Sequence, residues 1–288
     1  NKDKAMISKQ LVTLKNDVPL KNDAADFIIK DINKDKLYNF LRDMEFNRLL
    51  SQAISFYGEP RSNDFNKKTS AKKNNKINIK IYKTISKEKQ LDELIKKLDE
   101  KSIIAVDTET SSLNPQEAEL VGVSICYEAN ESFYIPLGHK ETTELKKDTV
   151  LKKLKPILED PSIKKVGQNI KYDFIIFKNH GIELSSIEDT MLLSYTLDAG
   201  NNRHNMDTLS ELHLGHKTIS YKDLVGTGKK QLNFSEVDLK SATHYAAEDA
   251  DITLRLYEIL SERVYEEKLE KVYEEFEKPM IKILSKLE

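Results

Sequence analysis

Two carboxylates stand at the end of an apolar run. SIIAVDTE is typical of a buried strand, and Asp107 and Glu109 lie two residues apart within it. Side chains two apart on a strand share a face, so both carboxylates are expected to point the same way. A partly buried pair of like charges is costly without a counter-charge, and oxygen ligands suit Mg²⁺ or Mn²⁺. The motif alone is weak, because Asp and Glu make up 48 of 288 residues and are common where a strand reaches solvent.

Two further segments place polar groups on helices. In VGQNIKYD a short strand runs into a helix, with Asn169 at the helix start and Asp173 one turn in. A capping Asn and an acid at a helix N-terminus explain this pattern equally well. In HYAAEDAD, Tyr245 and Asp249 are four apart and share a helix face. There the alternative is a Tyr ring in the core and an Asp in water.

The three segments together indicate more than each alone. One strand and two helices, in that order, can converge at one edge of a sheet. They would bring together Asp107, Glu109, Asp173 and Asp249. Four carboxylates around one point can hold two cations about 4 Å apart, which is an arrangement that hydrolyses phosphodiesters.

The surrounding pattern predicts the scaffold, an α/β fold with a mixed β-sheet flanked by helices. IKIYKTI alternates like a strand, and Ser86 can cap the helix that follows. SIIAVDTE, ELVGVSICYE, ESFYIPLGH and KKVGQN read as further strands. Helices are predicted over 148–159, over IKYDFIIFKNHG with Gly181 closing it, and over SATHYAAEDADITLRLYEIL.

The first 57 residues predict a small helical appendage. ISKQLVTLKNDVPL reads as a helix that breaks near Asp17 and Pro19. Asn33 can cap a second helix, with apolar residues on one face at Leu37, Phe40, Leu41 and Met44. Residues 58–78 are rich in Lys and Asn and read as a solvated linker, with an electrostatic hold on DNA as the alternative.

Composition narrows the class of protein. The net charge is −2, so a strand-binding surface would have to come from local patches. The single cysteine, Cys126, lies in an apolar run and reads as a buried filler, which fits a reducing cytoplasm. No apolar stretch approaches the roughly 20 residues that span a membrane.

Five strings resemble one family. DTETSSL, VGQNIKYD, EDTMLLSY, NRHNMDTL and YAAEDADITL are similar, in order and spacing, to the 3′→5′ proofreading exonuclease domain of bacterial DNA polymerase I, family A. The resemblance covers 79–265 and implies the RNase H-like fold of the four-carboxylate exonucleases. Residues 1–57 resemble the tail of that family's 5′-nuclease domain, and 266–288 resemble the start of its polymerase domain. We therefore expect a fragment with neither 5′-nuclease nor polymerase activity, taken from an enzyme of DNA replication and repair.

The resemblance also implies roles. Asp107, Glu109 and Asp249 would hold one cation, and Asp107 would bridge to a second that Asp173 holds through water. The cations would be Mg²⁺ or Mn²⁺, with Zn²⁺ a possibility at one site. Tyr245 would orient the attacking water, and 5′-mononucleotides would be released. Another branch of the exonuclease superfamily uses a His five residues before the last Asp, in the motif H-x-A-x-x-D, and His244 matches that motif. The surrounding strings favour Tyr245.

Partners follow from the same resemblance. They are the 3′ ends of single-stranded DNA and the polymerase domain of the same full-length chain, in the cytoplasm at the nucleoid. Matching positions predict strand contacts by stacking and phosphate binding. These are Leu113, as a wedge near the terminal base, with Gln168, Asn169, Tyr172, Arg203 and Tyr221.

Two other functions stay open. One is a catalytically silent module that binds DNA or braces a polymerase, which loss of any metal carboxylate would favour. The other is an RNA 3′ exonuclease like RNase D, which shares the carboxylates but lacks the polymerase-like flanks.

Overall fold

The computed structural model forms two compact units, Asn1–Lys67 and Lys68–Glu288. The described residues are 2–15, 17–19, 32–44, 46–58, 77–141, 143–228 and 231–288. Apart from residues 58, 77 and 78, the predicted linker over 58–78 lies outside the described residues.

The first unit is helical, as predicted. It contains α1 (Lys2–Val12), α2 (Lys34–Asp43) and α3 (Asn47–Tyr57). The Asn33 side chain accepts a hydrogen bond from the Lys36 amide at 3.0 Å, which confirms the predicted cap of α2.

The predicted apolar face of α2 was partly wrong. Phe40 and Met44 are 52% and 53% exposed, whereas Tyr38 and Leu41 are buried against Ala53 of α3. The Tyr38 hydroxyl donates to the Gly58 carbonyl at 2.6 Å. This bond brings the ring inward and turns the buried face of α2 toward Tyr38.

The second unit is built on one six-stranded mixed sheet, which confirms the predicted fold class. Its strands are β1 (Lys83–Thr84), β2 (Ile103–Thr110), β3 (Leu120–Glu128), β4 (Glu131–Pro136), β5 (Lys164–Gly167) and β6 (Ile187–Asp189). They lie in the order β1-β4-β3-β2-β5-β6. The β2–β3–β4 meander is antiparallel, and the outer pairs β1–β4, β2–β5 and β5–β6 are parallel.

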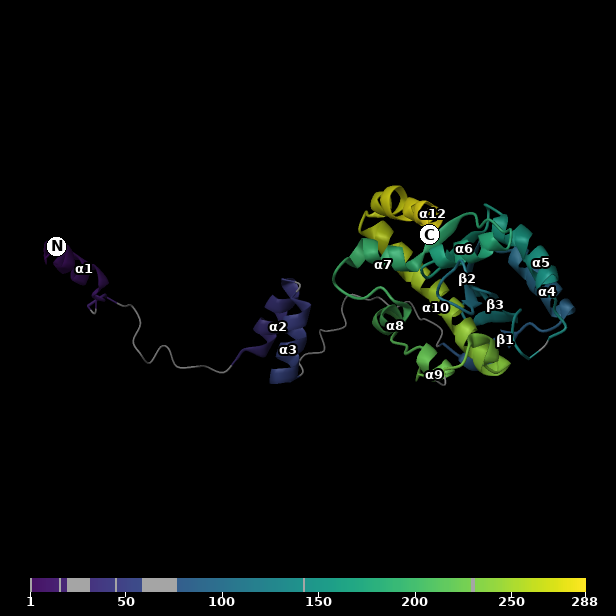
Figure 1. The fold of residues 1–288 in the computed structure, drawn as a ribbon, viewed down its shortest axis with the longest axis horizontal. Helices are drawn as coiled ribbons and strands as arrows, with labels where there is room; N and C mark the ends of the chain where they lie inside the picture. Colours follow the sequence, from purple (N-terminus) through teal and green to yellow (C-terminus); the bar gives the residue numbers. More distant parts are fainter. Residues whose placement is uncertain are drawn as a thin grey trace. The chain divides into compact units, whose positions relative to one another are not determined.

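Helices cover both faces of the sheet (Figure 1). The main core lies between the sheet and α4 (Glu88–Asp99), α5 (Lys147–Glu159) and α6 (Lys171–Asn179), while α10 (Leu239–Glu266) packs on the other face. The remaining elements are η3 (Ile79–Ile81), α7 (Thr190–Asp198), α8 (Met206–Leu209), η4 (Ser210–Leu214), α9 (Tyr221–Val225), η6 (Phe234–Glu236), α11 (Glu270–Val272), η7 (Tyr273–Glu277) and α12 (Lys278–Leu287).

Small residues bring α10 close to the sheet. Ala246, Ala247 and Ala250 are fully buried, and Ala250 packs against Ala105 and Cys126 of the central strands. Cys126 is therefore a core filler, as predicted. Because no bulky side chain separates helix from sheet, polar side chains of α10 can reach the end of β2.

Two local predictions need correction, and one strand was missed. The alternating run IKIYKTI is not one long strand: Ile79–Ile81 form a 3₁₀ turn, because the Asn78 side chain accepts from the Lys80 amide, and β1 is two residues long. Ser86 does not cap α4; the helix N-cap is Lys87, and Gln90 Oε1 accepts from the Ser86 and Lys87 amides at 3.1 Å. The short strand β6 was not predicted.

The segment after residue 265 packs on the same unit. Ile281 of α12 is buried in the main core, and the Tyr273 hydroxyl accepts from the Asp189 amide at 3.0 Å and donates to Glu188 at 2.9 Å. The Lys278 ammonium also donates to Glu188 at 2.9 Å. The boundary that the resemblance implies at 265/266 is therefore not a break in packing.

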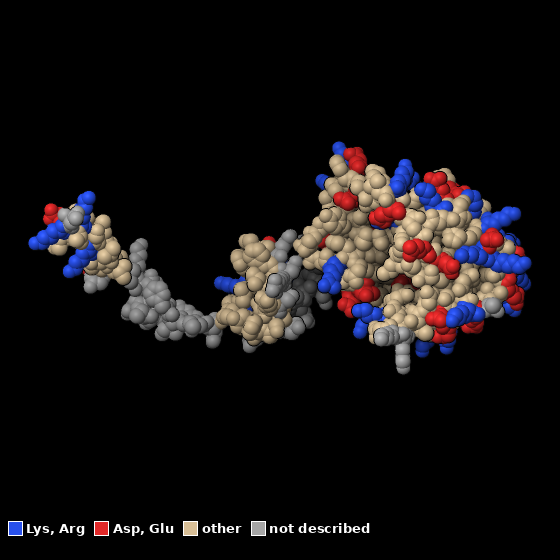
Figure 2. All heavy atoms as spheres, in the orientation of Figure 1, with Lys and Arg blue, Asp and Glu red and all other residues tan. Residues whose placement is uncertain are grey.

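Charge is mixed over the visible face of the second unit, where basic and acidic side chains alternate (Figure 2). Among the helices that the structure describes, none combines the length and apolar character needed to cross a bilayer.

Candidate active site

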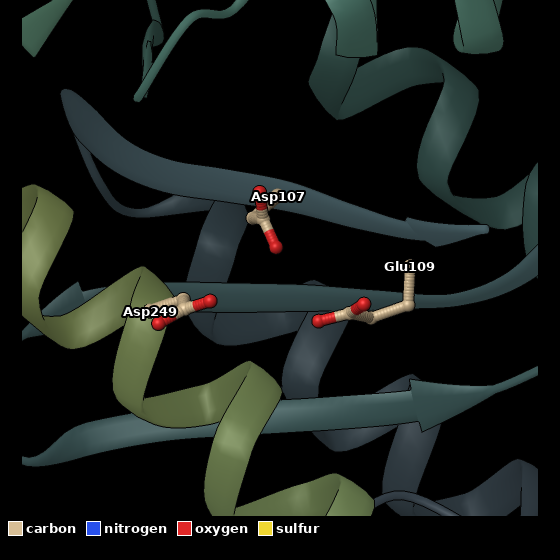
Figure 3. A group of neighbouring side chains, drawn as sticks. All are labelled: Asp107, Glu109 and Asp249. Carbon is tan, nitrogen blue, oxygen red and sulfur yellow. The ribbon is translucent and has the colours of Figure 1, made fainter. Parts of the chain in front are cut away.

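Three carboxylates from two elements meet beside the sheet. Asp107 and Glu109 project from β2 toward α10, and Asp249 projects from α10 toward them (Figure 3). One ligand oxygen from each of the three lies within 4.8 Å of the others. The predicted convergence of DTE and HYAAEDAD is therefore present in the structure.

The cluster is electrostatically unfavourable as it stands. Burial raises the pKa of Asp107 to about 6. Burial, and then the charges of Asp107, Asp249 and Asp173, hold the pKa of Glu109 well above its usual range. Within the described part of the chain, none of the ion pairs includes one of the four carboxylates. An all-oxygen donor set lacking a counter-charge fits divalent cations of the Mg²⁺ type.

The fourth carboxylate, Asp173 of α6, is held by Thr108, the residue between the two acids of β2. The amide and the hydroxyl of Thr108 donate to Asp173 Oδ1 at 2.9 and 2.5 Å. Burial, with the charge of Asp107 next, raises its pKa well above the ordinary value. Asp173 is not one of the three residues whose oxygens meet within 4.8 Å. Its charge interacts with Asp107 and with Glu109, although its oxygens stand outside the group of three, which fits a carboxylate that serves a second cation.

Tyr245 and His244 point to different places. Tyr245 hydrogen-bonds Asp249, and this bond works against the rise of the Asp249 pKa that burial causes. Its ring packs against Phe234 and Tyr221, with centroids 6.0 and 5.9 Å away. His244 instead lines a separate open pocket with Tyr82 and other residues near the start of α10.

A model of the 3′-5′ exonuclease family matches residues 82–265, the same stretch that forms the sheet and carries this cluster. The chain belongs to this family. The predicted resemblance is thereby confirmed.

Relatives of this exonuclease are longer proteins. DNA polymerase I of Pseudomonas aeruginosa is 36% identical over 296 residues, which is 100% of this chain and 32% of the relative. DNA polymerase I of Rhizobium leguminosarum is 41% identical over 227 residues, or 72% of this chain and 22% of the relative. The chain thus spans a third or less of the length of these relatives.

Solved structures agree on the fold. NrnC of Brucella melitensis superposes with a TM-score of 0.52 at 22% identity, covering 71% of this chain and 88% of NrnC. The POL domain of Pol1 from M. smegmatis superposes with a TM-score of 0.56 at 16% identity, covering 71% of this chain and 31% of that one. With the six-stranded mixed sheet, these neighbours establish the RNase H-like exonuclease fold.

Strand β3 needs a glycine beside the carboxylate cluster. Gly122 of β3 pairs with Glu109, and a Cβ at Gly122 would lie 2.1 Å from the Tyr134 hydroxyl. That hydroxyl bonds His139 Nε2 at 2.7 Å, and His139 Nδ1 bonds the Val237 carbonyl at 3.2 Å. A carbonyl only accepts, so Nδ1 carries the hydrogen and Nε2 accepts from Tyr134. Burial lowers the pKa of His139, which agrees with a neutral ring.

Asp189 joins the starts of two helices. It is 1% exposed, caps α7 through the amides of Met191 and Leu192 at 2.8 and 3.4 Å, and accepts from Asn169 and Ile170 at 3.1 and 3.0 Å. Asn169 therefore does not cap α6; it turns the chain into the helix with a left-handed φ of 59°, which Asn tolerates. One carboxylate thus fixes the start of the helix that carries Asp173.

The residues predicted to contact the DNA strand differ in their exposure and in their hydrogen bonds within the protein. Leu113 is 95% exposed after β2, Arg203 is exposed, and Tyr221 is 40% exposed beside Tyr245. Gln168 donates to the His204 carbonyl at 2.7 Å and accepts from the Thr190 hydroxyl, so it ties the end of β5 to the segment carrying Arg203.

Tyr172 is likewise engaged within the protein. Its hydroxyl donates to the Ser112 carbonyl at 2.5 Å and bonds the Thr110 hydroxyl at the same distance. It therefore holds the start of the loop that carries Leu113.

Sequence reasoning missed the residues that orient this site. Thr108 stands between the two acids of DTE and was passed over as a strand residue. Asp189 had a signal, because an acid directly before the apolar run TMLLSY is typical of a helix N-cap.

Proposed function

We propose that this chain is a metal-dependent 3′→5′ exonuclease that shortens DNA strands from their 3′ ends and releases 5′-mononucleotides. The observation that carries the proposal is the convergence of Asp107, Glu109 and Asp249 within 4.8 Å. None of these three carboxylates takes part in an ion pair within the described part of the chain. We further propose that it is the proofreading module of a DNA polymerase I, at work in the cytoplasm at the nucleoid. The relatives' names and the resemblance support this assignment.

The carboxylates and Tyr245 would have different roles in catalysis. Asp107, Glu109 and Asp249 would hold one divalent cation, and Asp107 with Asp173 would hold the second. Bound Mg²⁺ or Mn²⁺ would lower the pKa of a water molecule and stabilise the charge that develops at the leaving 3′ oxygen. Tyr245, fixed by Asp249 and by its aromatic neighbours, would orient the attacking water.

The strand end would bind over this cluster. Leu113 and Tyr221 offer apolar surface to the terminal base, and Arg203 offers a charge to the backbone. Gln168, Asn169 and Tyr172 complete the proposed set. Gln168 and Tyr172 also hydrogen-bond within the protein, to the His204 and Ser112 carbonyls, so they would also hold the segments that carry Arg203 and Leu113.

The test is digestion of single-stranded DNA labelled at its 5′ end, in EDTA and with Mg²⁺ or Mn²⁺, by wild type and by Asp107→Ala. We expect a metal-dependent ladder that grows from the 3′ end, and a rate at least about a thousandfold lower in the variant, because several kcal/mol of charge stabilisation is lost. A folded wild-type sample that leaves the strand intact would refute the proposal and favour a silent DNA-binding module.

An RNA strand of the same sequence separates the remaining alternative, because only RNA carries the 2′ hydroxyl. RNase D of Trypanosoma brucei shares the fold, with a TM-score of 0.53 at 19% identity. Faster digestion of the RNA than of the DNA would assign the chain to RNA trimming instead.

A further inference from the structure

Glu248 is a buried carboxylate that the proposed chemistry does not use. It precedes Asp249 on α10 and is 1% exposed, yet it is not among the three carboxylates that meet within 4.8 Å. Its oxygens accept from His216 Nε2 at 2.8 Å and from the Ile219 amide at 2.7 Å. Since an ionised carboxylate only accepts, His216 Nε2 carries the hydrogen.

These bonds tie a separate segment to α10. His216 and Ile219 belong to the stretch 215–220, which runs from the end of η4 directly into α9. The Thr218 hydroxyl donates to Asp207 at 2.6 Å, so α8 holds the same stretch from its other side. A buried carboxylate is costly without partners, so Glu248 strongly favours the arrangement in which both donors are in place.

The stretch delivers Tyr221 to the site. Tyr221 is the first residue of α9, two residues after Ile219. Its ring stacks on Phe234 with an interplanar angle of 5° and meets the edge of Tyr245 at 5.9 Å. Glu248, Tyr245 and Asp249 lie within five residues of one helix. The carboxylate that anchors the stretch 215–220 and the catalytic cluster therefore share one rigid element.

We propose that Glu248 and His216 form a latch that positions Tyr221 over the place where the 3′-terminal nucleotide binds. The inference rests on the proposed function and adds two positioning residues to it. The latch acts through Tyr221 and touches neither the cations nor the scissile bond. Opening it should therefore weaken binding of the strand end more than it slows hydrolysis of bound strand.

A double-mutant cycle in the full chain tests this. His216→Ala, Tyr221→Ala and the double variant are compared on single-stranded DNA with saturating Mn²⁺. We expect His216→Ala to raise KM about tenfold, the size expected for one lost hydrogen bond to a carboxylate, with kcat changed less than about twofold. We expect the double variant to have the same KM as Tyr221→Ala, because both substitutions remove the same contact, that of Tyr221 with the strand end.

Two further variants separate positioning from general damage. His216→Gln keeps an N–H donor at the reach of Nε2 and should restore most of the KM. His180→Ala removes another ring that makes one backbone bond, to Ile176 at 2.9 Å, and should leave KM unchanged. Additive KM effects in the double variant, or a fall in kcat without a rise in KM, would overturn the latch.

Amide hydrogen exchange without DNA gives a readout that does not depend on activity. We expect faster exchange over 217–225 in His216→Ala, with exchange over α6 unchanged. Unchanged exchange over 217–225 would overturn the latch even in an active enzyme. A wild type that fails to digest DNA would refute the proposed function, and the exchange result would then decide the latch alone.

Discussion

Replacing Asp107 by Asn removes one charge from the crowded cluster while keeping the shape of the side chain. Burial raises the pKa of Asp107 from 3.8 to about 6. Each pKa unit corresponds to about 1.4 kcal/mol, so keeping Asp107 ionised in the metal-free protein costs on the order of 3 kcal/mol. Allowing for imperfect hydrogen bonding of the new amide, we expect the metal-free variant to gain about 2 kcal/mol of unfolding free energy. In a domain of this size that is a rise in Tm of about 4–8 °C.

The assay is thermal unfolding in EDTA at pH 7.5, with Asp251→Asn as the matched control. Asp251 is also a buried acid of this unit, but it accepts from Arg255 at 2.9 Å and from the Tyr82 hydroxyl at 2.7 Å. Breaking such a paired charge should cost about 3–5 kcal/mol. We therefore expect Tm to rise in Asp107→Asn and to fall in Asp251→Asn. A lower Tm for metal-free Asp107→Asn would refute the argument that the cluster is unpaired.

The pH dependence has a defined sign. The folded-state pKa of Asp107 lies above its unfolded value, so its destabilising effect is present above about pH 6 and is lost as pH falls through that value. The stability gain of Asp107→Asn should therefore be largest above pH 7 and shrink toward pH 4. Burial lowers the pKa values of His139 and His213, so these groups destabilise the fold as pH falls. They do so equally in wild type and variant, and the difference between the two proteins is unaffected. A gain that grows on acidification would contradict the assignment.

Three further predictions concern the residues around the cluster. Tyr245→Phe should lower kcat about a hundredfold while His244→Ala stays near wild type; the reverse, in steady-state digestion of DNA, would move the water-orienting role to His244. Thr108→Val removes the hydroxyl that holds Asp173, so half-maximal activity should need about tenfold more Mn²⁺, and an unchanged metal titration would show that this bond is dispensable. Asp189→Ala leaves four backbone amides, one buried and three part-buried, without their acceptor and should cost about 3 kcal/mol or more in urea unfolding; a loss below about 1 kcal/mol would contradict its role as a joint between helices.

Short-range periodicity predicted which side chains share a face. The spacing of Asp107 and Glu109 on a strand, and of Tyr245 and Asp249 on a helix, was sufficient for that. It could not predict that the two pairs meet, because they are separated by more than 130 residues and the meeting depends on how closely α10 packs on the sheet. The order of strand and helices made the meeting possible, and the resemblance supplied the reason to expect it.

The wrong predictions arose where tertiary contacts outweighed local pattern. The alternation of IKIYKTI indicated a strand, but the Asn78 side chain bends its first half into a 3₁₀ turn. The strand β6 is three residues long and mostly acidic, and its burial depends on Tyr273, which is over eighty residues away. A helix cap at Asn169 was one of the alternatives that the sequence left open; the structure instead has a left-handed turn there, where Asp189 accepts from the backbone amide.

The most direct test of the central claim is anomalous diffraction from crystals of this chain soaked in Mn²⁺. We predict two peaks about 4 Å apart, one contacted by Asp107, Glu109 and Asp249 and the other between Asp107 and Asp173. Both peaks should vanish in Asp107→Asn while the fold is retained. A wild-type crystal with these four carboxylates ordered and no peak beside them would contradict the account.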